Sequence, residues 1–79
     1  MTNLEKLNRV FFEVFTTEEA ALDSTFDKRL VDEWDSVHQL NLAISMEEAF
    51  DFLLDAEDIL ELTSYDNARA ILAKYDIAL

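Results

Sequence analysis

The sequence of 79 residues contains neither glycine nor proline. Tight hairpin turns depend on these two residue types, because glycine allows backbone angles that side chains disfavour and proline presets the angle of a turn. Every turn in this chain must instead be built from Asn, Asp, Ser and Thr. This restriction argues against a β protein and favours helices joined by simple connections.

The charge of the chain is strongly negative. Eighteen Asp and Glu residues stand against six Lys and Arg residues, which gives a formal net charge of −12. Binding to a nucleic-acid backbone relies on Lys and Arg, so we expect no nucleic-acid partner and instead a partner protein with a basic surface. Hydrophobic residues make up 51% of the chain, enough for one core, and the length suits a single domain over residues 1–79. Because like charges repel, we expect this fold to be sensitive to salt.

The chain has no cysteine. This absence excludes disulfides, thiolate metal sites and a thiol nucleophile supplied by the protein, so any thiol chemistry must come from an added group. The first residues lack the pattern of a signal peptide, and no apolar run is long enough to span a bilayer. We therefore expect a cytoplasmic protein without a membrane span, and a monomer.

Apolar residues at steps of three and four predict a helix at each end of the sequence. The first is expected over Asn3–Phe15, where Thr2 and Glu5 fit a capping box. The last is expected to begin at Thr63 or Ser64. Its apolar face consists of Ala68, Ile71, Leu72 and Tyr75. Both helices are expected to pack against one core.

The segment 16–34 loses this periodicity, so we expect a long connection with room for a short turn of helix after Thr17. Trp34, at its end, is expected to anchor the connection by packing rather than to stack on a ligand. Four other apolar residues are expected to pack against the core: Leu22, Phe26, Leu30 and Val31.

A short acidic helix is expected within Leu53–Leu62. Its acids invite comparison with a calcium-binding loop, but an EF-hand loop needs a glycine turn that this chain lacks. We therefore expect a solvated acidic face without a structural metal site, and weak binding of divalent ions to this face is the alternative. Its acids include Asp55, Glu57, Asp58 and Glu61.

A second long helix is expected over Ser36–Phe52, and its apolar residues fall on two sides. One side is expected to face the core and consists of Leu42, Met46, Ala49, Phe50 and Leu53. The opposite side, which we call the apolar strip, consists of Val37, Leu40 and Ile44 and is interleaved with Asn41, Glu47, Glu48 and Asp51. The alternative is a helix buried all round, but so short a chain has little left to cover a second face. The apolar strip is expected to dock a partner with an apolar groove and a basic rim.

Ser36 stands at the start of this helix. Ser36 and Gln39 fit a capping box, and Asp35 is an alternative cap. A phosphodiester on Ser36 would also be favoured there, because free N–H groups and the positive end of the helix dipole attract an anion. His38 lies about 160° around the helix from Ser36, so a Ser-His catalytic pair is disfavoured and a solvated His38 is expected. Local features thus allow both a cap and an attachment site at Ser36.

The residues Trp34-Asp35-Ser36-Val37, followed by Leu42, Met46-Glu47-Glu48 and Phe50-Asp51, resemble the acyl carrier protein family. The likeness covers nearly the whole chain, including the long connection and the acidic third helix. It implies an all-α fold, a small four-helix bundle of three main helices and one short third helix. It also implies that Ser36, preceded by Asp35, carries a 4'-phosphopantetheine arm transferred from coenzyme A by a magnesium-dependent phosphopantetheinyl transferase. The thiol of the arm would hold an acyl or aminoacyl group as a thioester, which fits the absence of cysteine.

The resemblance implies a carrier and not an enzyme. Its partners would be the transferase, an acyl- or aminoacyl-loading ligase, and acyltransferase or synthase enzymes. Their basic patches would face Val37, Leu40, Ile44, Glu47, Glu48 and Asp51. Fatty-acid carriers commonly have a glycine shortly before Asp-Ser and acids two and five residues after the serine.

This chain departs from that pattern. Glu33-Trp34 precede the motif, and His38 and Asn41 follow it. We therefore favour a carrier for polyketide or other specialised acyl transfer over the general carrier of fatty acid biosynthesis. The alternative is an unmodified acidic helical module for protein interaction, in which Ser36 only caps the helix.

Overall fold

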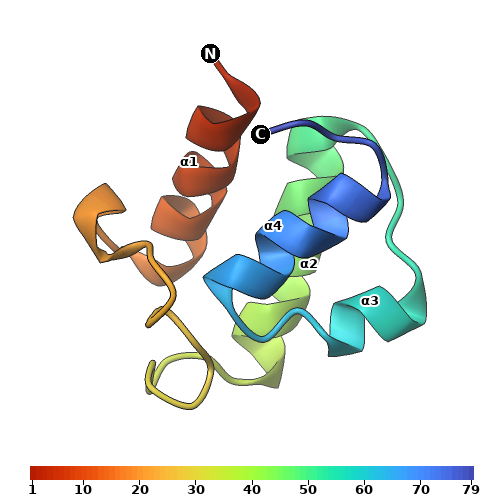
Figure 1. Ribbon diagram of the computed structural model, residues 1–79. Coiled ribbons are helices and arrows are strands. Elements are labelled where there is room, and N and C mark those ends of the chain that lie inside the picture. Colours follow the sequence, from red (N-terminus) through yellow and green to blue (C-terminus); the bar gives the residue numbers. More distant parts are fainter.

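Four α-helices follow one another along the chain and are joined by segments without strands (Figure 1). The computed structural model describes residues 1–79. The helices are α1 (Asn3–Phe15), α2 (Ser36–Phe50), α3 (Ala56–Leu60) and α4 (Tyr65–Lys74), and a turn of 3₁₀ helix, η1 (Glu19–Ala21), follows α1. The expected all-helical class is confirmed, and the element order agrees with the sequence pattern.

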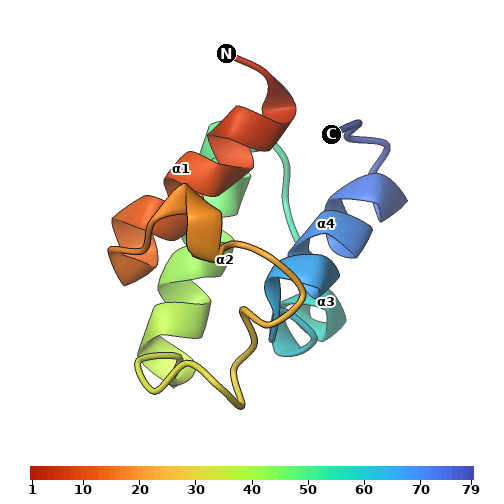
Figure 2. The same cartoon turned by 60° about the vertical axis from the view of Figure 1, so that its left-hand side comes forward.

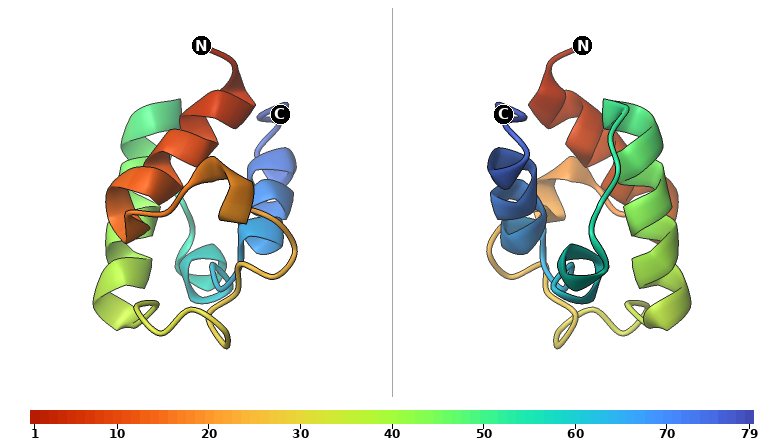
Figure 3. Two further views of the ribbon diagram at one scale, coloured as in Figure 1. Left: turned by 90° about the vertical axis from the view of Figure 1, so that its left-hand side faces the viewer. Right: turned by 90° about the vertical axis from the view of Figure 1, so that its right-hand side faces the viewer.

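The helices form a small bundle in which α1 and α2 pack along one another (Figures 1 and 2). The short helix α3 packs against α2, at the end of the molecule away from the chain termini (Figure 3). The two termini meet at the other end, where Asn3 Nδ2 donates to the carbonyl of Ala78 at 2.7 Å. None of the helices is both long and apolar enough to cross a membrane.

The bounds of α1 agree with the sequence prediction. The Thr2 hydroxyl accepts a hydrogen bond from the Glu5 N–H, and the Glu5 carboxylate accepts one from the Thr2 N–H, so the expected capping box is present. The helix ends at Thr16, whose φ of 54° is left-handed. Glycine is the usual residue at such an end, and this chain uses a β-branched residue in its place.

An aromatic cluster forms the centre of the core. The Phe11 ring makes edge contacts with Phe26 and Tyr65, at centroid distances of 5.7 and 5.2 Å, and the Phe15 ring lies 4.7 Å from Trp34. Trp34 is buried, which confirms that it anchors the end of the long connection by packing. Its Nε1 has no hydrogen-bond partner within the chain.

The connection from residue 16 to residue 35 is held against the start of α4. The N–H of Lys28 donates to the carbonyl of Thr63 at 2.8 Å, and the N–H of Tyr65 donates to the carbonyl of Phe26 at 2.9 Å. Phe26 is buried, and Leu22 and Val31 pack on the core in half-buried positions, as expected. The prediction for Leu30 is wrong, because its side chain is 68% exposed.

Helix α2 ends at Phe50, two residues before the expected end. Asp51 takes left-handed backbone angles (φ 54°, ψ 57°) and turns the chain away from the helix axis. The predicted core position of Leu53 is therefore wrong: this side chain is 80% exposed, and Leu54 is buried in its place. The other four residues of the expected core face do contact the core, with Leu42 and Met46 fully buried and Ala49 and Phe50 half-buried.

Helix α3 is shorter than the expected range Leu53–Leu62, and the prediction of a wholly solvated acidic face is wrong at Asp58. The Asp58 side chain is buried and pairs with Lys74 Nζ at 2.9 Å, while its other oxygen accepts from the Tyr75 hydroxyl. These hydrogen bonds, first from Tyr75 and then from Lys74, hold the pKa of Asp58 below its ordinary value. The carboxylate thus joins α3 to the end of α4.

Helix α4 agrees with the sequence prediction. Ser64 caps it by accepting from the Asn67 N–H at 2.9 Å. Ala68, Ile71 and Leu72 are buried, and Tyr75 is half-buried against the core.

Candidate functional site

Ser36 is the first residue of α2, and its side chain is exposed. The cap of the helix is Asp35, whose Oδ1 accepts a hydrogen bond from the backbone N–H of His38 at 2.9 Å. The capping-box interpretation of Ser36 and Gln39 is therefore wrong, and the alternative cap is the one present. The Asp35 carboxylate accepts from a free N–H group of the first turn, and the Ser36 hydroxyl makes no hydrogen bond within the chain.

Gln39 has a role that the sequence did not indicate. Its side chain is buried, and its Nε2 donates to the carbonyls of Ile59 at 2.8 Å and Leu60 at 3.3 Å. Its Oε1 accepts from Lys28 Nζ at 3.0 Å. One amide side chain thus ties the first turn of α2 to the last turn of α3 and to the long connection. The position of Gln39, a polar residue on the core-facing side of α2, is the sequence feature that could have indicated this role.

His38 is more restricted than the solvated side chain that we expected. Its Nδ1 lies 2.9 Å from Asp35 Oδ1, and its ring stacks on Phe15 of α1 with centroids 5.7 Å apart and planes 19° apart. About a third of the side chain stays exposed, at 34%. The ring is engaged with Asp35, and no hydrogen bond joins it to Ser36.

The carboxylate of Asp35 is charged at neutral pH. The backbone N–H of His38, and then its ring, hold the pKa of Asp35 below the ordinary value. The start of α2 therefore carries a negative charge directly before Ser36.

The apolar strip lies on the exposed side of α2. Val37, Leu40 and Ile44 are 65%, 52% and 44% exposed, while Leu42, Ala43 and Met46 on the other side are buried. The alternative of a helix buried all round is therefore excluded. The apolar strip begins one residue after Ser36.

The three acids expected around the apolar strip differ in how exposed their side chains are. Glu48 and Asp51 are exposed. Glu47 is half-buried, because its Oε2 accepts from the backbone N–H of Leu54 at 2.9 Å and holds the segment after α2. Together with Phe52 and Leu53, these three acids and Ile44 line a shallow hollow at the end of the apolar strip. Helix α2 contains no Lys or Arg, and its only acids, Glu47 and Glu48, lie near its end.

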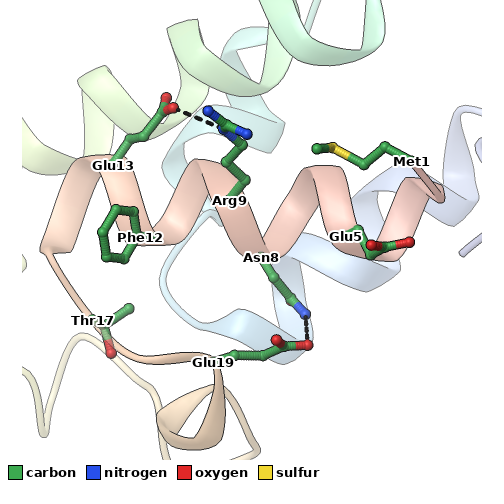
Figure 4. A pocket seen from close by; sticks show the side chains of 8 residues that line it. All are labelled: Met1, Glu5, Asn8, Arg9, Phe12, Glu13, Thr17 and Glu19. Atoms are coloured by element: carbon green, nitrogen blue, oxygen red, sulfur yellow. Dashed lines mark hydrogen bonds and ion pairs between the residues drawn. The ribbon is translucent and has the colours of Figure 1, made fainter.

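A second hollow lies on the outer face of α1 (Figure 4). The exposed ring of Phe12 is flanked there by an Arg9–Glu13 ion pair at 3.3 Å and by Asn8, which donates to Glu19 at 3.1 Å. Arg9 and Glu13 are thus paired with one another, and Glu5 accepts from the backbone N–H of Thr2. No three His, Asp or Glu side chains in the chain converge in a way that could hold a metal ion.

Comparison with known proteins gave no match, whether with protein-family models, with curated proteins or with solved structures.

Proposed function

We propose that this chain is an acyl carrier protein whose Ser36 bears a 4'-phosphopantetheine arm. The observation that carries the proposal is the Ser36 hydroxyl, which is exposed, is not used as a helix cap and stands at the start of α2 beside the exposed apolar strip. A serine that only stabilised the helix would be expected to use its hydroxyl as the cap. Here that task falls to Asp35.

Attachment would proceed by transfer from coenzyme A on a phosphopantetheinyl transferase. The Ser36 oxygen attacks the phosphorus that bears the pantetheine arm. A new P–O bond forms, the P–O bond of the diphosphate link breaks, and adenosine 3',5'-bisphosphate leaves. The hydroxyl proton passes to a base of the transferase, and magnesium bound there would neutralise the phosphate charge. The resulting phosphodiester would sit at the first turn of α2, where backbone N–H groups and the helix dipole favour an anion.

The thiol at the end of the arm supplies the nucleophile that the cysteine-free sequence lacks. It would carry an acyl or aminoacyl group as a thioester between a loading ligase and acyltransferase or synthase enzymes. The apolar strip with Glu47, Glu48 and Asp51 suits docking to a basic patch with an apolar centre. The neighbourhood of Ser36, with His38 and Asn41 on its first turns, favours a specialised pathway over general fatty acid synthesis.

The second candidate is an unmodified acidic module for protein interaction. The exposed apolar strip favours it as much as it favours a carrier, because an apolar surface rimmed by acids suits a basic partner in either case. The two candidates differ at Ser36. A carrier loses its function when the hydroxyl is removed, whereas an interaction module keeps its partner.

Intact mass tests the proposal. After incubation with coenzyme A, magnesium and a broad-specificity phosphopantetheinyl transferase, we expect the wild type to gain one phosphopantetheinyl group. Ser36→Ala should gain none, and Ser24→Ala, which changes an exposed serine in the long connection, should gain the same mass as the wild type. A wild type that stays unmodified with several transferases would favour the interaction module.

A further inference from the structure

The ring of His38 is fixed by two independent contacts at the start of α2. Its Nδ1 is bonded to Asp35 Oδ1 at 2.9 Å, and its face is stacked on Phe15. Asp35 remains 62% exposed, and it directly precedes Ser36. A protein that closes over Ser36 therefore meets the Asp35–His38 pair.

The bond to Asp35 decides where the ring carries its proton. An ionised carboxylate can only accept hydrogen bonds, so the Nδ1 of His38 must bear hydrogen. When the ring is neutral, Nε2 is then bare, and it has no hydrogen-bond partner in the chain. Any further proton is gained at Nε2, and the ring becomes an imidazolium that still donates to Asp35.

From α1, the ring of His38 faces the uncharged ring of Phe15. From the long connection, Lys28 reaches α2 but donates its Nζ to Gln39, and Asp32 and Glu33 lie exposed in the turn before Trp34. No Lys or Arg occurs in α2 itself. The charge directly before Ser36 therefore depends on the Asp35–His38 pair, which carries one negative charge with a neutral ring and no net charge with an imidazolium.

We propose that His38 is a specificity-determining residue that sets the charge with which the start of α2 meets a basic partner. The inference rests on the proposed function, because the partner considered is the enzyme that modifies Ser36. With a neutral ring, the exposed Asp35 carboxylate attracts Lys or Arg side chains of that enzyme. With an imidazolium, the same carboxylate is neutralised within the chain, and the basic partner binds more weakly.

Three substitutions at position 38 separate charge from structure. His38→Gln is uncharged at every pH and keeps a hydrogen-bonding side chain. His38→Lys carries a permanent positive charge beside Asp35. His38→Phe keeps an aromatic ring for stacking on Phe15 but loses the bond to Asp35. The fluorescence of Trp34, the one tryptophan, reports whether each variant is folded.

The experiment measures kcat and KM of the transferase at one pH, with coenzyme A in excess and the carrier as the varied substrate. We expect the KM of His38→Lys to lie about fivefold above that of His38→Gln, the effect of one charge at close range in water. The kcat of the two variants should differ little, because Ser36 itself is unaltered.

A KM for folded His38→Lys no higher than that of His38→Gln would overturn the inference about His38 and leave the proposed function standing. If His38→Lys does not fold, His38→Arg makes the same comparison. A wild type that no transferase modifies would overturn the proposed function and the role of His38 with it. A His38→Phe variant with the KM of His38→Gln would support charge, rather than a specific ring contact, as the property that matters.

Discussion

Asp35 Oδ1 lies 2.9 Å from the backbone nitrogen of His38 and 2.9 Å from the Nδ1 of the same residue. One carboxylate oxygen therefore caps α2 and orients the imidazole. Ser36, between these two residues, contributes to neither contact. The residue that stabilises the helix start and the residue proposed to carry the arm are thus different, so stability and modification can be altered separately.

Removal of the cap should lower stability far more than removal of the Ser36 hydroxyl. We expect Asp35→Ala to reduce the free energy of unfolding by ~1 kcal/mol, the usual effect of losing a helix cap. Ser36→Ala should change it by less than ~0.5 kcal/mol, as for an exposed residue without contacts. Urea denaturation followed by circular dichroism measures both values. A larger loss in Ser36→Ala than in Asp35→Ala would mean that the serine is the cap.

A charge placed on the apolar strip should disturb docking and not folding. Ile44→Glu adds a carboxylate to an exposed apolar position, so we expect the free energy of unfolding to change by less than ~0.5 kcal/mol. The KM of the transferase or of a loading enzyme for the carrier should rise several-fold, because the partner's apolar groove would have to desolvate a charge. Steady-state kinetics at fixed coenzyme A concentration measure this.

The matched control for that substitution lies on the buried side of the same helix. Leu42→Ala removes a fully buried side chain and should lower the free energy of unfolding by ~2–5 kcal/mol. Its KM should stay near that of the wild type under conditions where it remains folded. If Ile44→Glu unfolds the protein as Leu42→Ala does, the assignment of the two sides of α2 is wrong.

The buried Asp58 should make the stability of the fold fall in acid. Its pKa is lower in the folded protein than in the unfolded chain, because Tyr75 and Lys74 donate hydrogen bonds to the carboxylate. The stabilisation is therefore fully present above the unfolded value, about 4 for aspartate, and is lost as the pH falls through the lower folded value. Asp58→Asn lacks this contribution at every pH.

Urea denaturation of both proteins along a pH series tests this prediction, because the difference between them cancels the titration of the other acids. We expect the wild type to be more stable near neutral pH and the difference to shrink below about pH 4. Glu57→Gln, at an exposed neighbouring position, should show a constant difference from the wild type. A gap between wild type and Asp58→Asn that persists undiminished in acid would exclude an ionised Asp58 as its source.

A glycine at the end of α1 should stabilise the protein. Thr16 has a φ of 54°, in the left-handed region that is unfavourable for a β-branched residue. Thr16→Gly removes this strain, although it also increases the freedom of the unfolded chain, so we expect a net gain of ~0.5–1 kcal/mol. Thermal and urea unfolding measure the gain, with Thr17→Gly as the control that should bring none. A Thr16→Gly variant less stable than the wild type would show that the threonine side chain contributes more than its backbone strain costs.

The sequence predicted the elements whose signals are local. The bounds of α1 follow from a capping box and a regular apolar face, and the start of α4 follows from the Ser64 cap. The two sides of α2 followed from helical periodicity alone, and the exposure of Ile44 agrees with it. Each of these features depends on residues within a few positions of one another.

The errors concern features that depend on distant residues or on unusual backbone angles. The end of α2 at Phe50 depends on a left-handed Asp51, a conformation that aspartate adopts only occasionally, so Leu53 was placed on the wrong side. The burial of Asp58 depends on Lys74, sixteen positions away, and the contacts of Gln39 with α3 depend on residues twenty and twenty-one positions away. Such pairings exist only once the helices have packed.

The partial burial of the His38 ring is another feature that depends on a distant residue. The neighbour that covers it, Phe15, belongs to α1, and the sequence offered no reason to place these two rings together. The stacking requires that α1 pack against the start of α2, whereas the bond to Asp35 is local.

Localisation of the modification tests the central claim most directly. The chain is incubated with coenzyme A, magnesium and a broad-specificity phosphopantetheinyl transferase, digested, and its peptides are fragmented in a mass spectrometer. The account predicts one phosphopantetheinyl group per chain, on Ser36 and on none of Ser24, Ser45 or Ser64. An unmodified Ser36 after treatment with several transferases, or a group attached at another serine, would contradict it.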